Sequence, residues 1–194
     1  MTPAISLTES QSMTALRSFL LGILAANIEV VAGQDNRVPE PIGQTFVVMS
    51  ILSRERIETN TVTTVDGLLL QVPVAGTRMD LQPVKFSVQL DVHGPGGGDI
   101  VQTITTLFRS EYGTTAFAAS GFDVTPLYMS DPRQMIFING EQQIENRWSV
   151  DAVMQCNPIV TTAQDFAASI SISASQQGAG PGGLIDVDVI YPPI

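Results

Sequence analysis

Apolar residues near the start of the chain recur at the spacing of one helical face. They are Leu16, Phe19, Leu20, Ile23 and Leu24. Thr8 and Gln11 have the spacing of a capping box, in which each residue's side chain accepts a hydrogen bond from the other's backbone N–H. The pattern therefore predicts one amphipathic helix over residues 9–26, followed by a short strand over residues 28–31.

Farther on, the apolar positions alternate with polar ones. Residues 84–92 read VKFSVQLDV, with every second residue apolar, and residues 45–57 form a second, less regular strand that ends in charged residues. Alternation with period two indicates a strand with one face on a core and the other in water. Within residues 135–156, Asn139-Gly140 is a strong hairpin signal. The strand that follows it alternates again, placing Trp148 and Cys156 on its apolar face.

A glycine-rich turn separates the strand at 84–92 from a helical pattern over residues 99–112. The stretch reads DVHGPGGGDIVQTITTLFRSEYG. It lacks the lysine of a phosphate-binding P-loop, and Asp99 stands where a dinucleotide fingerprint needs glycine. We therefore interpret the turn as a strand-to-helix joint, with Asp99 as N-cap, Gln102 completing a capping box and Gly113 just after the helix end. Three consecutive glycines exceed what a joint needs, so we expect an exposed, mobile turn or close approach of a neighbouring subunit's backbone.

The order of elements predicts an α+β fold with a mostly antiparallel β-sheet and two helices packed on one face. Residues 58–82 are expected to form a hairpin or a long arm. Residues 165–173 fit either a short helix or a strand. We predict a single domain over residues 1–175, and a glycine-rich linker with an extended C-terminal tail over residues 176–194.

The charge balance argues against several classes of partner. Only 14% of the 194 residues are charged, and the formal net charge is −10. An acidic chain is repelled by nucleic acid backbones and anionic membranes, while a low charged fraction suits a surface covered by copies of itself. The apolar run at residues 19–26 is too short to span a bilayer, and we do not interpret it as a signal peptide. We expect a soluble protein made in the cytoplasm.

Candidate chemistry is sparse. One histidine and one cysteine make a His/Cys metal site improbable, and no cofactor is expected. His93 could act as a general base, but no motif around it supplies a nucleophile, so a surface or interface histidine is the better interpretation. Cys156 fits a buried inert thiol, and Trp148 fits a core residue, with an interface role second. Nothing in the sequence requires an enzyme.

Several longer strings resemble those of a known family. They are GQDNRVPEP, FVVMSILSRERIETN, VQLDVHGP, LFRSEYG and PLYMSDPRQMIFINGEQQIENRWSVDAVMQCNPIV, which lie between about Gln34 and Val160. Together they resemble the neck or tail terminator family of long-tailed bacteriophages. The resemblance implies a tail-terminator-like α/β subunit of a homo-hexameric ring that caps the tail tube, with no catalytic residues.

The implied partners are further copies of the chain, the tail tube protein, the neck or head connector protein and, in a contractile tail, the sheath protein. DNA would pass through the lumen without specific binding, which suits an acidic subunit. The protein would be located in the tail or neck of the virion after assembly in the host cytoplasm. Alternatives are a head-completion or neck connector ring, a small hydrolase using His93 with distant carboxylates, and a small-ligand binding domain.

The predicted contact residues lie in two loops, on one strand end and in the C-terminal tail. They are Gln34, Asp35, Asn36 and Arg37 in the loop that ends at Pro41, Arg54 and Arg56 on the strand, Asp131, Arg133 and Gln134 in the second loop, and Tyr191 and Ile194 in the tail.

Overall fold

The computed structural model describes residues 2–33, 41–66, 76–138, 140, 142, 144–165, 172–174 and 185–187. The chain divides into two compact units. The first comprises Met1–Ala4, Val62–Asp80 and Val160–Ile194, and the second comprises Ile5–Thr61 and Leu81–Ile159. The domain boundary predicted after residue 175 falls outside the described residues and stays a prediction.

The second unit is built on a six-stranded sheet with the order β2-β3-β6-β9-β7, and β8 also pairs with β9. Its strands are β2 (Glu29–Ala32), β3 (Phe46–Arg56), β6 (Val84–His93), β7 (Val124–Met129), β8 (Arg133–Ile138) and β9 (Ile144–Cys156). Only the β2–β3 pair is parallel, and the other pairs are antiparallel. The structure thus confirms a mostly antiparallel α+β fold. It also confirms the hairpin, in which Ile138 pairs with Ile144.

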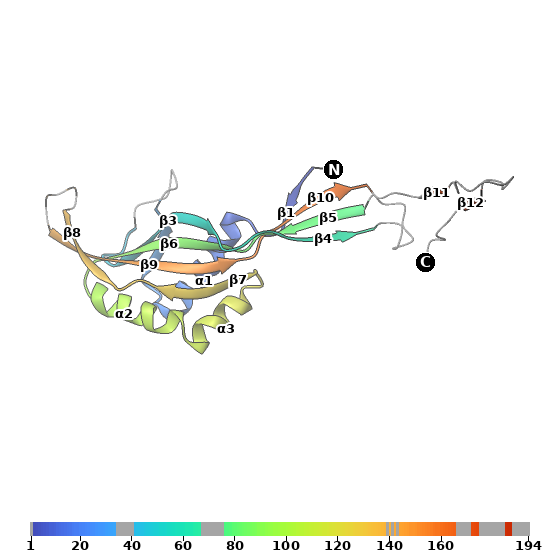
Figure 1. Cartoon of the computed structure of the whole chain (residues 1–194). Helices are drawn as coiled ribbons and strands as arrows, with labels where there is room; N and C mark the ends of the chain where they lie inside the picture. The colour runs from blue at the N-terminus through green and yellow to red at the C-terminus, as the bar shows by residue number, and fades with distance from the viewer. Residues whose placement is uncertain are drawn as a thin grey trace. The chain divides into compact units, whose positions relative to one another are not determined.

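Three helices among the described residues pack on one face of this sheet: α1 (Glu9–Ile23), α2 (Gly97–Phe108) and α3 (Glu111–Ala119) (Figure 1). The prediction of two helices was therefore one short. The sequence of α3, EYGTTAFAA, hides it because glycine and threonine lower helix propensity and few residues form an apolar stripe. This helix is stabilised instead by the packing of Phe117 into the core.

The first helix begins as its sequence predicts. The backbone N–H of Thr8 donates to Oε1 of Gln11 at 2.8 Å, and the N–H of Gln11 donates to Oγ1 of Thr8 at 3.3 Å. The helix ends at Ile23 instead of residue 26, because Leu24 has extended backbone angles. Its apolar face, with Leu16, Phe19 and Leu20 fully buried, faces the sheet.

The junction between α2 and α3 corrects the role predicted for Gly113. This glycine lies in the first turn of α3, where its N–H donates to Oγ of the N-cap residue Ser110 at 3.4 Å. A Cβ at this position would lie 2.4 Å from the carbonyl oxygen of Phe108. The glycine is therefore needed because the last turn of α2 and the first turn of α3 touch, and it does not end a helix.

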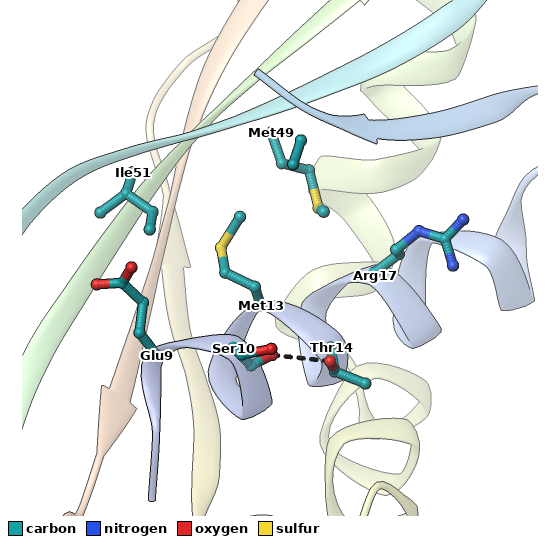
Figure 2. Close-up of a pocket in the computed structure, with 8 residues that line it drawn as sticks. Glu9, Ser10, Met13, Thr14, Arg17, Met49 and Ile51 are labelled. Atoms are coloured by element: carbon teal, nitrogen blue, oxygen red, sulfur yellow. Dashed lines mark hydrogen bonds between the residues drawn. The ribbon is translucent and has the colours of Figure 1, made fainter. Parts of the chain in front are cut away.

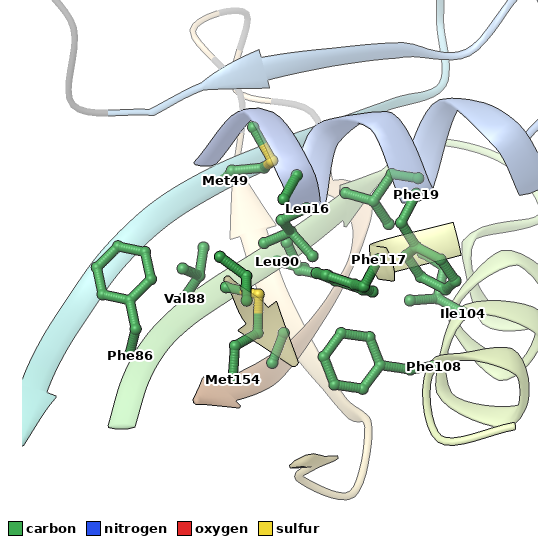
Figure 3. Close-up of a cluster of buried hydrophobic side chains, with 14 of the residues drawn as sticks. Leu16, Phe19, Met49, Phe86, Val88, Leu90, Ile104, Phe108, Phe117 and Met154 are labelled. Atoms are coloured by element: carbon green, nitrogen blue, oxygen red, sulfur yellow. The ribbon is translucent and has the colours of Figure 1, made fainter. Parts of the chain in front are cut away.

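The core lies between the helices and the alternating residues of β6 and β9 (Figure 3). Phe19 of α1 packs against Phe108 of α2 and Phe117 of α3, with ring centroids 5.7 and 5.5 Å apart. Phe86 and Leu90 of β6 are fully buried on the sheet side. This aromatic cluster joins all three helices, so they pack together on one face of the sheet.

The first unit contains most of a four-stranded sheet with the order β1-β10-β5-β4. Its strands are β1 (Ala4–Ile5), β4 (Thr61–Val65), β5 (Gly76–Leu81) and β10 (Ile159–Gln164). The two neighbours β4 and β5 fall within the 58–82 segment and fit the predicted hairpin or arm. A separate antiparallel pair joins β11 (Ile172–Ala174) to β12 (Ile185–Val187), so the described end of the ambiguous 165–173 stretch is a strand.

Candidate interaction surfaces

The glycine turn between β6 and α2 is specified by contacts within the chain. Gly94 has φ +94°, and a Cβ there would lie 2.0 Å from the carbonyl oxygen of Gln44. Gly96 has φ +73° and is itself the N-cap, so α2 begins at Gly97 and Asp99 lies within the first turn. The prediction that Asp99 caps the helix was therefore wrong. A left-handed backbone at Gly96 starts the helix without a side-chain cap.

The remaining glycines make room for Trp148. A Cβ on Gly97 would lie 3.1 Å from Cδ1 of the indole, and one on Gly98 would lie 3.4 Å from its Cζ2. The expected exposure holds for Pro95 and Gly96, whereas Gly94 and Gly97 are buried. The backbone that approaches Gly94 closely is that of Gln44 in the same chain. The half-buried Trp148 packs against the core, as its position on the strand predicts.

His93 ends β6 on the sheet face opposite the helices and is nevertheless buried, with 7% of its surface exposed. Its ring stacks on Phe46 of β3 at 4.7 Å between centroids, and Phe137 of β8 meets it edge-on at 5.1 Å. The interpretation of His93 as a surface residue is therefore wrong for the single chain. Neighbouring strands cover it with aromatic rings that are distant from it in sequence.

Charged groups surround this histidine. Arg147 donates to Oδ2 of Asp91 at 2.8 Å, and Gln89 donates to the same carboxylate. Glu145 lies 3.8 Å from Nδ1 of His93, an atom that has no hydrogen-bond partner among the described residues. Burial lowers the pKa of His93, only partly opposed by the charge of Glu145. The lowered pKa favours the neutral form of the imidazole between the two rings, a placement that gives no support to a hydrolase.

The β8–β9 hairpin carries the most exposed aliphatic side chains of the second unit's sheet. Ile136 is 88% exposed, Ile138 is 61% exposed and Ile144 is 82% exposed. The register places all three on the same side of the hairpin, while Met135, Phe137 and Glu145 lie on the other. Exposed apolar side chains gathered on one face make this face a candidate contact site. Alternation alone did not reveal it, because buried and exposed apolar faces have the same period.

A groove of about 450 Å³ lies where the first turns of α1 meet β2 and β3 (Figure 2). It is lined by Glu9, Ser10, Met13, Thr14, Arg17, Ala32, Met49 and Ile51. Arg17 is held by a 3.1 Å hydrogen bond from its Nε to the carbonyl oxygen of Val30. In Figure 2, Met13 and Met49 point toward each other, so sulfur and methyl groups line the groove between a carboxylate and a guanidinium.

The two arginines predicted as contacts on β3 already have partners within the chain. Arg54 lies 5.0 Å above the ring of Phe86 and 3.6 Å from Glu9, where it joins β3 to the start of α1. Arg56 lies beside the side-chain amide of Gln82. Both remain exposed. A contact role for them stays a prediction, and Arg54 also has a structural role that the sequence did not indicate.

The predicted loop at 131–134 is shorter than expected, because Arg133 and Gln134 begin β8. Arg133 lies 3.5 Å from Asp151 of β9, and Gln134 donates to Asn146 at 3.4 Å. Asp131 is exposed before the strand. These residues thus lie at the base of the hairpin. The remaining predicted contacts, Gln34, Asp35, Asn36, Arg37, Tyr191 and Ile194, lie outside the described residues.

Cys156 is buried on the apolar face of β9, with its Sγ 3.6 Å from Oγ of Ser12. Burial raises the pKa of this thiol, as expected for an inert cysteine. Within the described ranges, no group of three His, Cys, Asp or Glu side chains could hold a metal ion. No helix in the described part of the chain is long and apolar enough to cross a membrane.

Sequence comparison identifies the family. A search of proteins with curated descriptions gives no significant match. A family model described as phage neck terminator protein matches residues 10–178, which includes the whole six-stranded sheet, the hairpin, α2, α3 and all of α1 except Glu9. This match agrees with the resemblance carried by the strings between Gln34 and Val160. The chain belongs to the phage neck terminator protein family and is a structural protein of the phage tail or neck.

Proposed function

We propose that this protein forms a ring that ends the tail tube and joins the tail to the neck or head connector. The observation that carries the proposal is the family match across residues 10–178. In this role the protein acts by binding and catalyses no reaction. Its partners are further copies of the chain, the tube protein below, the connector above and the sheath in a contractile tail.

The surface of the second unit supports a subunit with several neighbours. The hairpin exposes three isoleucines, and the groove beside α1 presents methionine side chains. A chain with 14% charged residues has few charges to desolvate when such surfaces are covered. The net charge of −10 suits a ring whose lumen lets DNA slide without adhering.

Ring formation can be tested by native mass spectrometry and negative-stain imaging of the purified protein, alone and with tail tubes assembled from the tube protein. We expect sixfold rings, either free or seated at one end of each tube. Twelvefold rings that bind no tube end would favour the head-completion or connector alternative. Monomers in both settings would contradict a ring-forming terminator.

The location can be tested on intact particles with an antibody against the chain. Gold label at the junction of tail and head is the expected result. Label at the distal end of the tail, or along the tube, would contradict the proposed position. A DNA-binding assay over a range of salt concentrations complements this, because we expect no binding to duplex DNA even at low salt.

A further inference from the structure

We propose that the exposed isoleucine face of the β8–β9 hairpin inserts into the groove beside α1 of a second copy of this chain. The hairpin face comprises Ile136, Ile138 and Ile144, and the α1 groove is the cavity lined by Met13, Thr14 and the other residues named above. This contact rests on the proposed ring and names the two surfaces that would join neighbouring subunits.

The two sides of the hairpin differ in chemistry. On one side the paired residues are Gln134 with Trp148, Ile136 with Asn146 and Ile138 with Ile144, and none of these carries a charge. On the other side Arg133, Glu145 and Arg147 alternate with Met135 and Phe137. The charged side already has ion pairs and ring contacts within the chain. The uncharged side is therefore the one left to bind a groove that is lined in part by methionine side chains.

In a ring of identical chains, the net charge restricts which surfaces of two copies can meet. Two copies that each carry a net charge of −10 repel one another at long range. Contacts between them are stable only where apolar surface is buried and few like charges are brought together. The hairpin face meets that condition, because its exposed area is dominated by three isoleucines, whose transfer from water is favourable.

The α1 groove has the complementary form. Its volume of about 450 Å³ falls in the range of cavities that enclose apolar groups. Met13 and Met49 supply flexible side chains that adapt to the shape of an inserted group. Arg17 is held to Val30, and Glu9 lies 3.6 Å from Arg54, so the polar groups at this groove are already positioned by the chain itself.

The hairpin face and the α1 groove share no residue, so one chain can use both at once. Such a head-to-tail contact is heterologous, and its repetition closes a ring when the rotation between copies permits. A self-complementary hairpin-to-hairpin contact would instead stop at a dimer. The proposed interface is therefore a heterologous contact between two different surfaces, the hairpin face and the α1 groove.

Cysteine cross-linking distinguishes these contacts. Ile136→Cys is prepared in one chain and Thr14→Cys in another that carries a mass tag, while the native Cys156 is buried and serves as an internal unreactive thiol. Mild oxidation of the mixture under ring-forming conditions should give disulfide-linked heterodimers. Rings without heterodimers would overturn the contact and leave the ring itself standing. Homodimers of Ile136→Cys alone would indicate the hairpin-to-hairpin contact instead.

A matched pair of charge variants gives a second measurement. Ile136→Glu places a carboxylate on the uncharged side, whereas Met135→Glu places one on the opposite side, next to Arg147 in register, at a residue that is 48% exposed. We expect at least a tenfold weaker self-association of Ile136→Glu, and wild-type association and thermal unfolding for Met135→Glu. Equal association of the two variants would overturn the contact. A wild-type chain that stays monomeric even with tubes would contradict the proposed function as well.

Discussion

The two halves of strand β9 have the same alternating pattern and different surroundings. In the inner half, Val150, Ala152, Met154 and Cys156 share one face of the strand and are fully or almost fully buried under the helices. From Ile144 to Trp148 the same parity places Ile144 in solvent and leaves Trp148 half-buried. The difference arises because the buried half lies between β6 and β7 under the three helices, whereas the outer half extends into the hairpin with β8.

The alternating pattern has a different consequence in each half of β9. Alternation specifies which side chains share a face, because successive residues of a strand point to opposite sides. It does not specify what covers that face. In the inner half the cover is the protein's own core, and in the outer half we propose that it is another subunit. Substitutions in each half of β9 and at the boundary between them test this difference.

Removal of a core ring that covers the inner half should have the largest effect. Phe108→Ala leaves a cavity beside Phe19 and Phe117, and such truncations cost about 3–5 kcal/mol. The free energy of unfolding in urea measures the loss. A loss below about 1 kcal/mol would show that the helices do not cover the sheet as described.

In the glycine turn near the boundary between the two halves of β9, substitution of Gly94 should destabilise the fold more than substitution of Gly96. Gly94→Ala combines a left-handed backbone, which costs about 1–2 kcal/mol, with overpacking against Gln44, which costs about 1–3 kcal/mol more. Gly96→Ala has the same backbone cost but open space around its Cβ. Urea unfolding should therefore rank Gly94→Ala clearly below Gly96→Ala. The reverse order would contradict the close approach of the 44–45 backbone.

The buried histidine under the hairpin base should make stability depend on pH. Because burial lowers the pKa of His93 below its ordinary value of 6.5, the unfolded chain binds a proton more readily than the folded chain. The contribution of the neutral imidazole to folding stability is fully present above pH 6.5 and is lost as the pH falls toward the lower pKa of the folded chain. Asp91, Glu145 and Arg147 are the charged groups that face the ring.

Thermal unfolding at several pH values between 7.5 and 5.5 tests this expectation. His93→Phe keeps an aromatic ring between Phe46 and Phe137 and removes the titrating group. We expect a smaller fall in Tm for this variant than for the wild-type chain over that range. Equal falls would show that other groups cause the pH dependence.

Truncation at the outer end of β9 should have the smallest effect on folding. Ile144 is 82% exposed, and substitutions at such positions usually change stability by about 0.5 kcal/mol or less. Ile144→Ala should therefore unfold in urea almost as the wild-type chain does. A loss comparable to that of Phe108→Ala would mean that the hairpin face is packed within the single chain, which would contradict its proposed role as a contact.

The sequence predicted the main elements where local signals were strong. The capping box at Thr8 and Gln11, the alternation of β6 and the hairpin around Asn139-Gly140 depend on neighbouring residues alone, and the structure contains all three elements. Of residues 139–143, which connect the two strands, only Gly140 and Gln142 are described. The family could also be identified from strings such as LDVHGP and SDPRQ.

The failures have a common physical cause. Asp99 and Gly113 were interpreted from local capping rules, but Gly96 is the N-cap of α2, and the close approach of Phe108 requires the glycine in α3. The helix α3 has a weak pattern and depends on packing by Phe117. His93 was placed correctly on the polar parity of β6, yet rings from β3 and β8 bury it. In each case a backbone conformation or a packing contact decides, either within a few residues, as at Gly96, or between distant segments, as at His93.

Local patterns along the chain are enough to specify the fold class, the helical start at Thr8, the faces of β6 and β9 and membership of a family of phage structural proteins, because periodicity, caps and recurring strings are properties of short segments. The folded chain was needed to show which apolar face is covered, which glycines meet a backbone or an indole, and that His93 is buried. Those outcomes depend on which segments meet in space, and the energies of burial and steric contact arise only when they meet.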